Sequence, residues 1–144
     1  MSVADNKALV RRFLRALWEQ RHPAAVDAWL APHYQRHLSP RTPPLPREGF
    51  TQRLARFYAA FPDTQGTIED MVAEGDRVVI RVTLHATHRG VFHGMAPTGK
   101  HVTVSLVEIL RIDGGHIVES WGGLDLGDLL HQLGAVVSVD PDVQ

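Results

Sequence analysis

The 144-residue chain contains no cysteine. This absence excludes disulfide bonds, thiolate nucleophiles and zinc sites built from cysteine. The chain also lacks an excess of charge of either sign, because 15 lysine and arginine residues stand against 16 acidic ones and give a formal net charge of -1. Such a balance offers no electrostatic footprint for nucleic acid, so we expect a small molecule as the partner and no nucleic acid.

Long apolar runs are missing as well. Although 44% of the residues are hydrophobic, no stretch approaches the roughly 20 consecutive apolar residues of a membrane-spanning helix. The amino terminus has no basic region followed by an apolar segment, which is the pattern of a secretory signal. We therefore expect a cytoplasmic protein without membrane contact, whose residues 1–144 form one domain around one core.

The first 60 residues carry a helical pattern. Apolar side chains recur at helical spacing over residues 5–20 and again over 48–60. Between these segments we predict a second helix over 24–30, which Pro32 would end because proline disfavours helical geometry in the residue before it. The proline-rich segment 39–47 cannot be regular helix or central strand, so it predicts a surface loop that can serve as a lid.

The rest of the chain predicts a mainly antiparallel sheet. Strand-like segments cover residues 67–73, 76–88, 101–112 and 116–124, and glycine-containing turns join the first to the second and the third to the fourth. A short helix over 126–133 follows the last strand. Helices first, then a meander of strands, indicate the α+β fold class.

Alternation along these strands separates apolar from polar side chains. His88 ends an apolar row, where it is either a hydrogen-bonded rim residue or a pocket residue. Glu108 interrupts the apolar row of its strand, and since burying an unpaired charge is costly, it is ion-paired, neutral or exposed. Trp121 and Asp125 share a parity and should lie on one side of the last strand. Trp121 is then either core packing or a pocket wall.

Asp125 lies where the last strand passes into the last helix, and two interpretations remain open. Its carboxylate can cap the first turn of the helix, or it can reach into a cavity. A metal site has little support, because His85 and His88 are three residues apart on a strand and point to opposite faces. Neither a glycine-rich phosphate loop nor a GxSxG nucleophile turn is present. We therefore predict chemistry by oxygen or imidazole groups, with no metal.

Several short segments, in their order and spacing, resemble the SnoaL-like polyketide cyclases of the nuclear-transport-factor-2-like superfamily over nearly the whole chain. The segments are NKALVRRF at 6–13, YQRH at 34–37, AFPD at 60–63, ATHRG at 86–90, PTG at 97–99, and IVESW at 117–121 followed by Asp125. Two departures concern the loop over the pocket. Ala86 stands where glycine is usual, and Met95-Ala96-Pro97 replaces a common double proline.

The resemblance implies a cone-shaped, curved antiparallel sheet wrapped by N-terminal helices around an apolar pocket, an α+β barrel, in a homodimer or homotetramer. For the founding enzymes it implies a cofactor-free intramolecular aldol condensation, which closes the last ring of an aromatic polyketide ester in antibiotic biosynthesis, a reaction of isomerase or lyase type. An aspartate that matches Asp125 acts there as general acid/base. The resemblance thus predicts Asp125 as the catalytic residue, with His37 and His88 as further catalytic pocket residues.

The resemblance also implies a small hydrophobic or aromatic polyketide-like substrate. An apolar pocket would raise the pKa of a buried carboxylate and so make it a stronger base. The residues predicted to contact this substrate are Trp18, Phe57, Phe92, Met95, Glu108 and Trp121. The superfamily also contains isomerases, dehydratases, hydrolases and proteins without catalysis, and a fold alone does not define a function. A hydrophobic-ligand-binding or accessory protein is therefore the alternative to an acid/base enzyme.

Overall fold

Helices lead and strands follow along the chain, and the computed structural model describes residues 1–135. The helices are α1 (Val3–Gln20), the 3-10 helix η1 (Pro23–Ala28), α2 (Arg47–Ala60) and α3 (Leu126–Gln132). The strands are β1 (Leu30–His37), β2 (Leu45–Pro46), β3 (Gln65–Glu74), β4 (Arg77–Thr87), β5 (His101–Asp113) and β6 (His116–Leu124). No helix within residues 1–135 is both long and apolar enough to cross a membrane.

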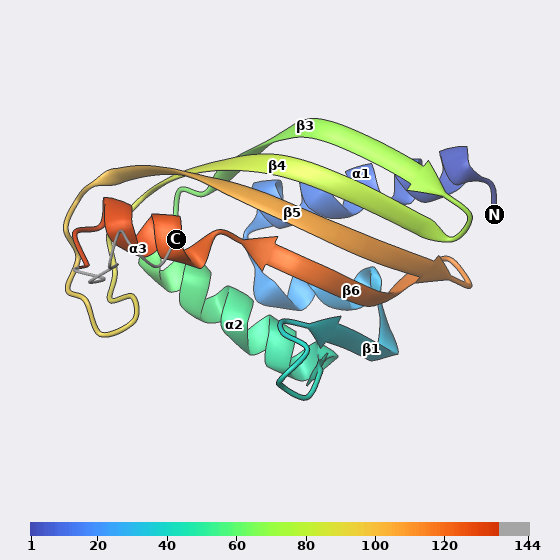
Figure 1. The fold of residues 1–144 in the computed structure, drawn as a ribbon, viewed down its shortest axis with the longest axis horizontal. Coiled ribbons are helices and arrows are strands. Elements are labelled where there is room, and N and C mark those ends of the chain that lie inside the picture. Colours follow the sequence, from blue (N-terminus) through green and yellow to red (C-terminus); the bar gives the residue numbers. More distant parts are fainter. Residues whose placement is uncertain (136–144) are drawn as a thin grey trace, which may run out of the picture.

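The strands form one six-stranded sheet in the order β2-β1-β6-β5-β4-β3. Neighbouring strands run antiparallel except β1 and β6, which run parallel. The sheet is curved and unclosed, and its long strands arch over α1 and α2 (Figure 1). The predicted α+β fold, a curved sheet wrapped by N-terminal helices, is confirmed.

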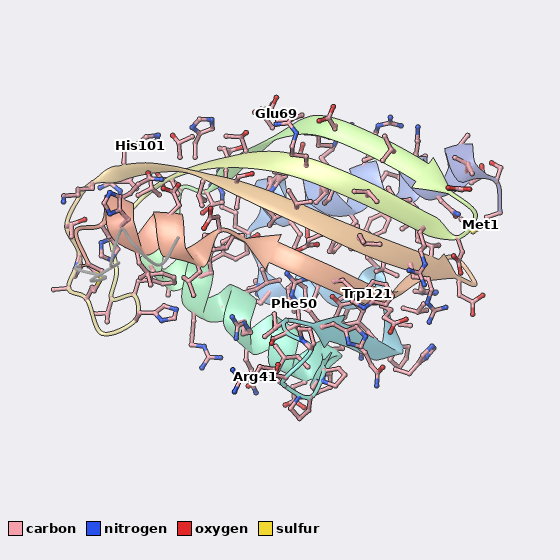
Figure 2. The ribbon with its side chains drawn as sticks, viewed as in Figure 1. Met1, Arg41, Phe50, Glu69, His101 and Trp121 are labelled. Carbon is pink, nitrogen blue, oxygen red and sulfur yellow. The ribbon has the colours of Figure 1, made fainter. Side chains whose placement is uncertain are left out.

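Side chains that alternate between apolar and polar along the strands also alternate between buried and exposed. In β4 the apolar row Val78, Ile80, Val82, Leu84 and Ala86 is buried, whereas the residues between them are exposed or half-buried. On the other side of the sheet, Glu69 and His101 project outward into solvent (Figure 2). The buried row packs against apolar side chains of α1, so the core lies on the concave side of the sheet.

The predicted second helix over residues 24–30 is wrong. Pro23–Ala28 form a 3-10 helix, and the chain then extends into β1, which contains Pro32. Pro32 lies between Leu30 and Gln35, where the pairing of β1 with β6 is irregular. Proline has no backbone N–H to donate, but at this irregular place no hydrogen bond between the strands is lost. The proline is therefore tolerated in the strand.

Candidate functional site

A cavity of about 1030 Å³ lies between the helices and the concave face of the sheet. Its lining comes from α1, β1, α2, β4, β5, β6 and the loop after β4, and most of it is apolar. Such a volume accommodates a small organic ligand. Four of the residues predicted from the sequence line this cavity: Trp18, Phe57, Phe92 and Glu108.

Trp18 reaches the cavity from α1 because Gly66 on β3 gives its indole room. A Cβ atom at Gly66 would lie only 2.2 Å from the Trp18 ring, so a side chain at that position would displace the indole. Phe57 of α2 and Phe92 complete an aromatic group with Phe61, in which neighbouring ring centroids are 4.9 to 6.2 Å apart. The rings of Phe57 and Phe92 line the cavity and give it flat apolar walls, whereas Phe61 packs behind them.

A buried ion pair is the main polar feature of the lining. Nη2 of Arg36 on β1 donates a hydrogen bond of 2.6 Å to Oε1 of Glu108 on β5, and each side chain is only 9% exposed. Nη1 of Arg36 donates to the hydroxyl of Ser120 at 3.3 Å, and that hydroxyl is also hydrogen-bonded to the phenol of Tyr34. The ion-pair alternative for Glu108 is thus confirmed. The guanidinium also lies 4.6 Å from the ring centroid of Phe50, which projects from α2 toward the sheet (Figure 2).

The surroundings fix the charge states of this cluster. Burial alone would lower the pKa of the Arg36 guanidinium, but the neighbouring Glu108 carboxylate and Tyr34 hydroxyl outweigh burial and raise that pKa above its ordinary value. Arg36 therefore stays cationic at any physiological pH. Burial raises the pKa of Tyr34, so its phenol stays neutral and keeps its proton for hydrogen bonding.

One carboxylate oxygen of Glu108 remains available to a molecule in the cavity. Oε1 is engaged by Arg36, whereas Oε2 accepts no hydrogen bond from the described residues and is not among the buried atoms without a partner, so it keeps some accessible surface. The residue opposite Glu108 on β6 is Gly122, which has no side chain to cover it. A carboxylate, a guanidinium and apolar walls can together accept a proton from carbon and stabilise an oxyanion.

Asp125 is the N-cap of α3, as one of the two interpretations predicts. Its Oδ1 accepts a hydrogen bond of 3.1 Å from the backbone N–H of Asp128. The side chain is exposed and is not among the residues that line the cavity, although Leu124 and Leu126 on either side are. The other interpretation, in which this carboxylate reaches into the cavity, does not match the structure. The catalytic role of Asp125 stays a prediction.

His37 and Trp121 lie on the outer face of the sheet rather than in the cavity. Their strands pair in parallel with Arg36 opposite Ser120 and His37 opposite Trp121, so alternation sends the first pair inward and the second pair outward. The two outer rings stack at 5.1 Å, and Nε2–H of His37 donates to Glu119 at 2.6 Å. The shared parity of Trp121 and Asp125 was predicted correctly, but that side is the solvent side.

His88 is fully buried and does not line the cavity. Its Nδ1 accepts the backbone N–H of Thr98 at 3.1 Å, which fixes the loop after β4, and its ring packs on Phe61. Nε2 has no hydrogen-bond partner within the described residues. Met95 also lies outside the lining, in a turn closed by two backbone hydrogen bonds with Phe92. The expectation that His88 and Met95 face the pocket is therefore wrong.

The sequence interpretation missed the polar residues linked to Glu108, which are Tyr34, Arg36 and Ser120. It also missed Arg53 and Arg56 in the cavity lining. Tyr34 and Arg36 share a parity in a segment that the prolines made look irregular, and that parity was the available signal. Among the described residues, no group of three or more histidine and acidic side chains is placed to hold a metal ion.

Comparisons with known proteins agree on one family. The family model for SnoaL-like polyketide cyclases matches residues 8–133. AclR from Streptomyces galilaeus, named as a candidate hydroxylase, is 32% identical with a TM-score of 0.85, and the match covers 99% of this chain and 93% of AclR. No curated protein matches the chain.

Two further solved structures are similar along most of their length. TsrD from Streptomyces laurentii is 29% identical with a TM-score of 0.80, and the match covers 94% of this chain and 99% of TsrD. IdmH from Streptomyces antibioticus, named as a candidate polyketide cyclase, is 30% identical with a TM-score of 0.71, and the match covers 86% of this chain and 97% of IdmH.

Proposed function

Because the chain belongs to the SnoaL-like polyketide cyclase family, we propose that it binds a polyketide-like carbonyl compound in the cavity and catalyses an intramolecular aldol cyclisation by acid/base chemistry. The observation that carries this proposal is a single carboxylate in the apolar cavity, that of Glu108. One of its oxygens is held 2.6 Å from the Arg36 guanidinium while the other accepts no hydrogen bond from the described residues.

The reaction would proceed in three balanced steps. Oε2 of Glu108 removes a proton from the carbon between two carbonyl groups, and the electron pair of the C–H bond moves into an enolate. The enolate carbon attacks a second carbonyl carbon of the same molecule, so one C–C bond forms and the attacked oxygen becomes an alkoxide. That alkoxide takes back the proton from Glu108, and the product is an isomer of the substrate.

Arg36 has the second role in this proposal. Its guanidinium has five N–H donors, of which two are used by Glu108 and Ser120. The remaining donors can stabilise the enolate oxygen, in a cavity where the low dielectric strengthens electrostatic interactions. A general base contributes roughly 10²- to 10⁴-fold to a rate, and the oxyanion donors supply a further share.

Asp125 is the rival proton acceptor, because the family resemblance assigns the acid/base role to this position. To act on a molecule in the cavity, its carboxylate would have to leave the backbone N–H of Asp128 and turn away from solvent. We therefore place Glu108 first. Both candidates are carboxylates, so conservative amide variants provide a direct comparison.

The test is turnover of aromatic β-keto esters by Glu108→Gln and Asp125→Asn, followed by the mass and retention time of the product. We expect Glu108→Gln to lower kcat by roughly 10²-fold or more and Asp125→Asn to change it less than about threefold, since asparagine also caps helices. A large loss of turnover in Asp125→Asn, with little change in Glu108→Gln, would identify Asp125 as the general base. Full turnover by both variants would remove carboxylate catalysis in this cavity.

Hydroxylation is a second candidate, supported by the similarity to AclR. It would also begin with proton removal from carbon, but it would consume dioxygen and two electrons from an external donor, and one oxygen atom would be released as water. A product heavier by one oxygen atom, instead of an isomer, would decide for it. Retention of an unaltered small molecule without turnover would favour a binding or accessory role. Assembly as a homodimer or homotetramer and the cytoplasmic location stay predictions.

A further inference from the structure

The charges of the cavity lining differ from those of the whole chain. The chain carries a formal net charge of -1, whereas the lining contains three arginines, Arg36, Arg53 and Arg56, and one carboxylate, Glu108. Three positive groups against one negative group leave an excess of two positive charges in the lining. A cavity with low-dielectric walls focuses such a field on the molecule inside it.

Within residues 1–135, one of these three arginines has an acidic partner. Arg36 pairs with Glu108, whereas neither Arg53 nor Arg56 forms a salt bridge within residues 1–135. Four arginines outside the cavity do pair with carboxylates: Arg47 with Asp27, Arg77 with Asp76, Arg81 with Asp70, and Arg111 with Glu119. Other arginines outside the cavity, such as Arg41 and Arg89, also form no salt bridge within residues 1–135. What distinguishes Arg53 and Arg56 is that they line the cavity.

Arg53 and Arg56 lie on the same face of α2, because residues three apart in a helix are neighbours. Burial lowers the pKa of Arg53, and the positive charges of Arg36 and Arg56 lower it further, so like charges surround this side chain without a compensating anion. Since the cost of holding these groups together is not offset by the described residues, an anion at this place would relieve it.

The two arginines are exposed although they line the cavity, which places them at its opening. Leu38 and Val91 line the cavity too and are 40% and 67% exposed. The opening thus combines two apolar side chains with two guanidinium groups that form no salt bridge in the described part of the chain. This composition suits a ligand whose apolar body lies inside while a charged end stays at the opening.

We propose that Arg53 and Arg56 form an anion subsite, which binds a carboxylate or phosphate group on the end of the substrate that remains at the cavity opening. The proposal rests on the proposed function for the apolar body of the substrate and adds a charged end to it. It also distinguishes this chain from the ring-closing reaction that the family resemblance implies, where the substrate is an ester. A guanidinium pair recognises both anions by parallel N–H···O bonds.

Binding of three small aromatic probes tests the subsite without any turnover. Methyl 1-naphthoate is neutral, 1-naphthoate carries a carboxylate and 1-naphthyl phosphate carries a phosphate on the same ring system. Isothermal titration calorimetry at low salt gives the three dissociation constants. We expect at least one anion to bind about tenfold tighter than the ester, because two exposed charge contacts are each worth a few-fold in affinity. The tighter of the two anions identifies the chemistry of the charged end.

The double variant Arg53→Gln/Arg56→Gln should reduce the anion preference to less than about twofold, because it weakens anion binding more than ester binding. Arg41→Gln/Arg89→Gln is the matched control, because it removes the same charge from exposed residues that lie outside the cavity lining and form no salt bridge within residues 1–135. It should keep the preference. Equal binding of all three probes by the wild type, or a preference that survives in the double variant, overturns the subsite. Full turnover by Glu108→Gln would refute the catalytic proposal and leave these affinities unaffected.

Discussion

The Arg36–Glu108 pair allows catalysis and stability to be separated in one series of variants. Glu108→Gln keeps the shape of the side chain and removes its charge, so Arg36 stays buried without a counter-ion. Breaking a buried pair from one side costs about 3–5 kcal/mol. We expect the lower end, about 3 kcal/mol, because this pair borders a cavity that water can enter. For a chain of this size that loss lowers Tm by about 10 °C.

The double variant Arg36→Met/Glu108→Leu removes both charges and fills the site with apolar side chains of similar volume. Such replacements are often neutral or stabilising by about 1–4 kcal/mol. We therefore expect its Tm to return to within a few degrees of the wild type or to exceed it. Turnover should stay at least about 100-fold below the wild type, because both the base and the oxyanion donor are gone.

Differential scanning calorimetry and the turnover assay of aromatic β-keto esters measure the two properties on the same preparations. The chain has no cysteine, so disulfide exchange cannot obscure the unfolding transition. Wild-type turnover by the double variant would refute the catalytic role of the pair and leave it as a structural ion pair. A Glu108→Gln variant as stable as the wild type would show that the charges are not coupled in the way the burial indicates.

Two further predictions concern the sheet. Gly122→Ala should lower the free energy of unfolding, measured in urea, by about 2–4 kcal/mol. Gly122 has φ of 96°, and a Cβ atom there would lie 2.3 Å from the carbonyl oxygen of Val107. A variant as stable as the wild type would contradict this prediction. Burial would raise the pKa of Glu119, but hydrogen bonds from His37 and Arg111 outweigh it and hold that pKa below its usual range. The stabilisation by Glu119 is thus fully present above its pKa in the unfolded chain and is lost as pH falls through its pKa in the folded protein. The loss of Tm that Glu119→Gln causes at pH 7 should therefore shrink below about pH 4. A loss of Tm that does not change with pH would refute this linkage.

The strands of the meander could be predicted because their signals are local. Alternation in β4 and the glycine turns fixed their positions within a few residues, and the break in the apolar row at Glu108 marked a real anomaly, a carboxylate on the buried face. Its partner could not be found from the sequence. Arg36 reaches Glu108 only because β1 pairs in parallel with β6, a contact between distant segments that no local pattern encodes.

The error at Trp121 has a clear physical cause. Alternation states which residues share a face of a strand, but when both faces mix polar and apolar residues it does not state which face is inward. Trp121 was correctly grouped with Asp125 and was assigned to the wrong side. His37, which the family resemblance predicted as a pocket residue, lies on the same outer side. For Asp125 the sequence left capping and pocket roles open, and the exposed carboxylate on the amide of Asp128 matches capping.

The long separation between the two halves of the ion pair has a consequence for how the protein is made. Arg36 and Glu108 are 72 residues apart in the chain, and β1 has no main sheet partner until β6 has left the ribosome. The nascent chain must carry the guanidinium of Arg36 in water until its carboxylate arrives. Docking of β1 is therefore expected to be the last and slowest event of folding, and the site becomes complete only at that moment.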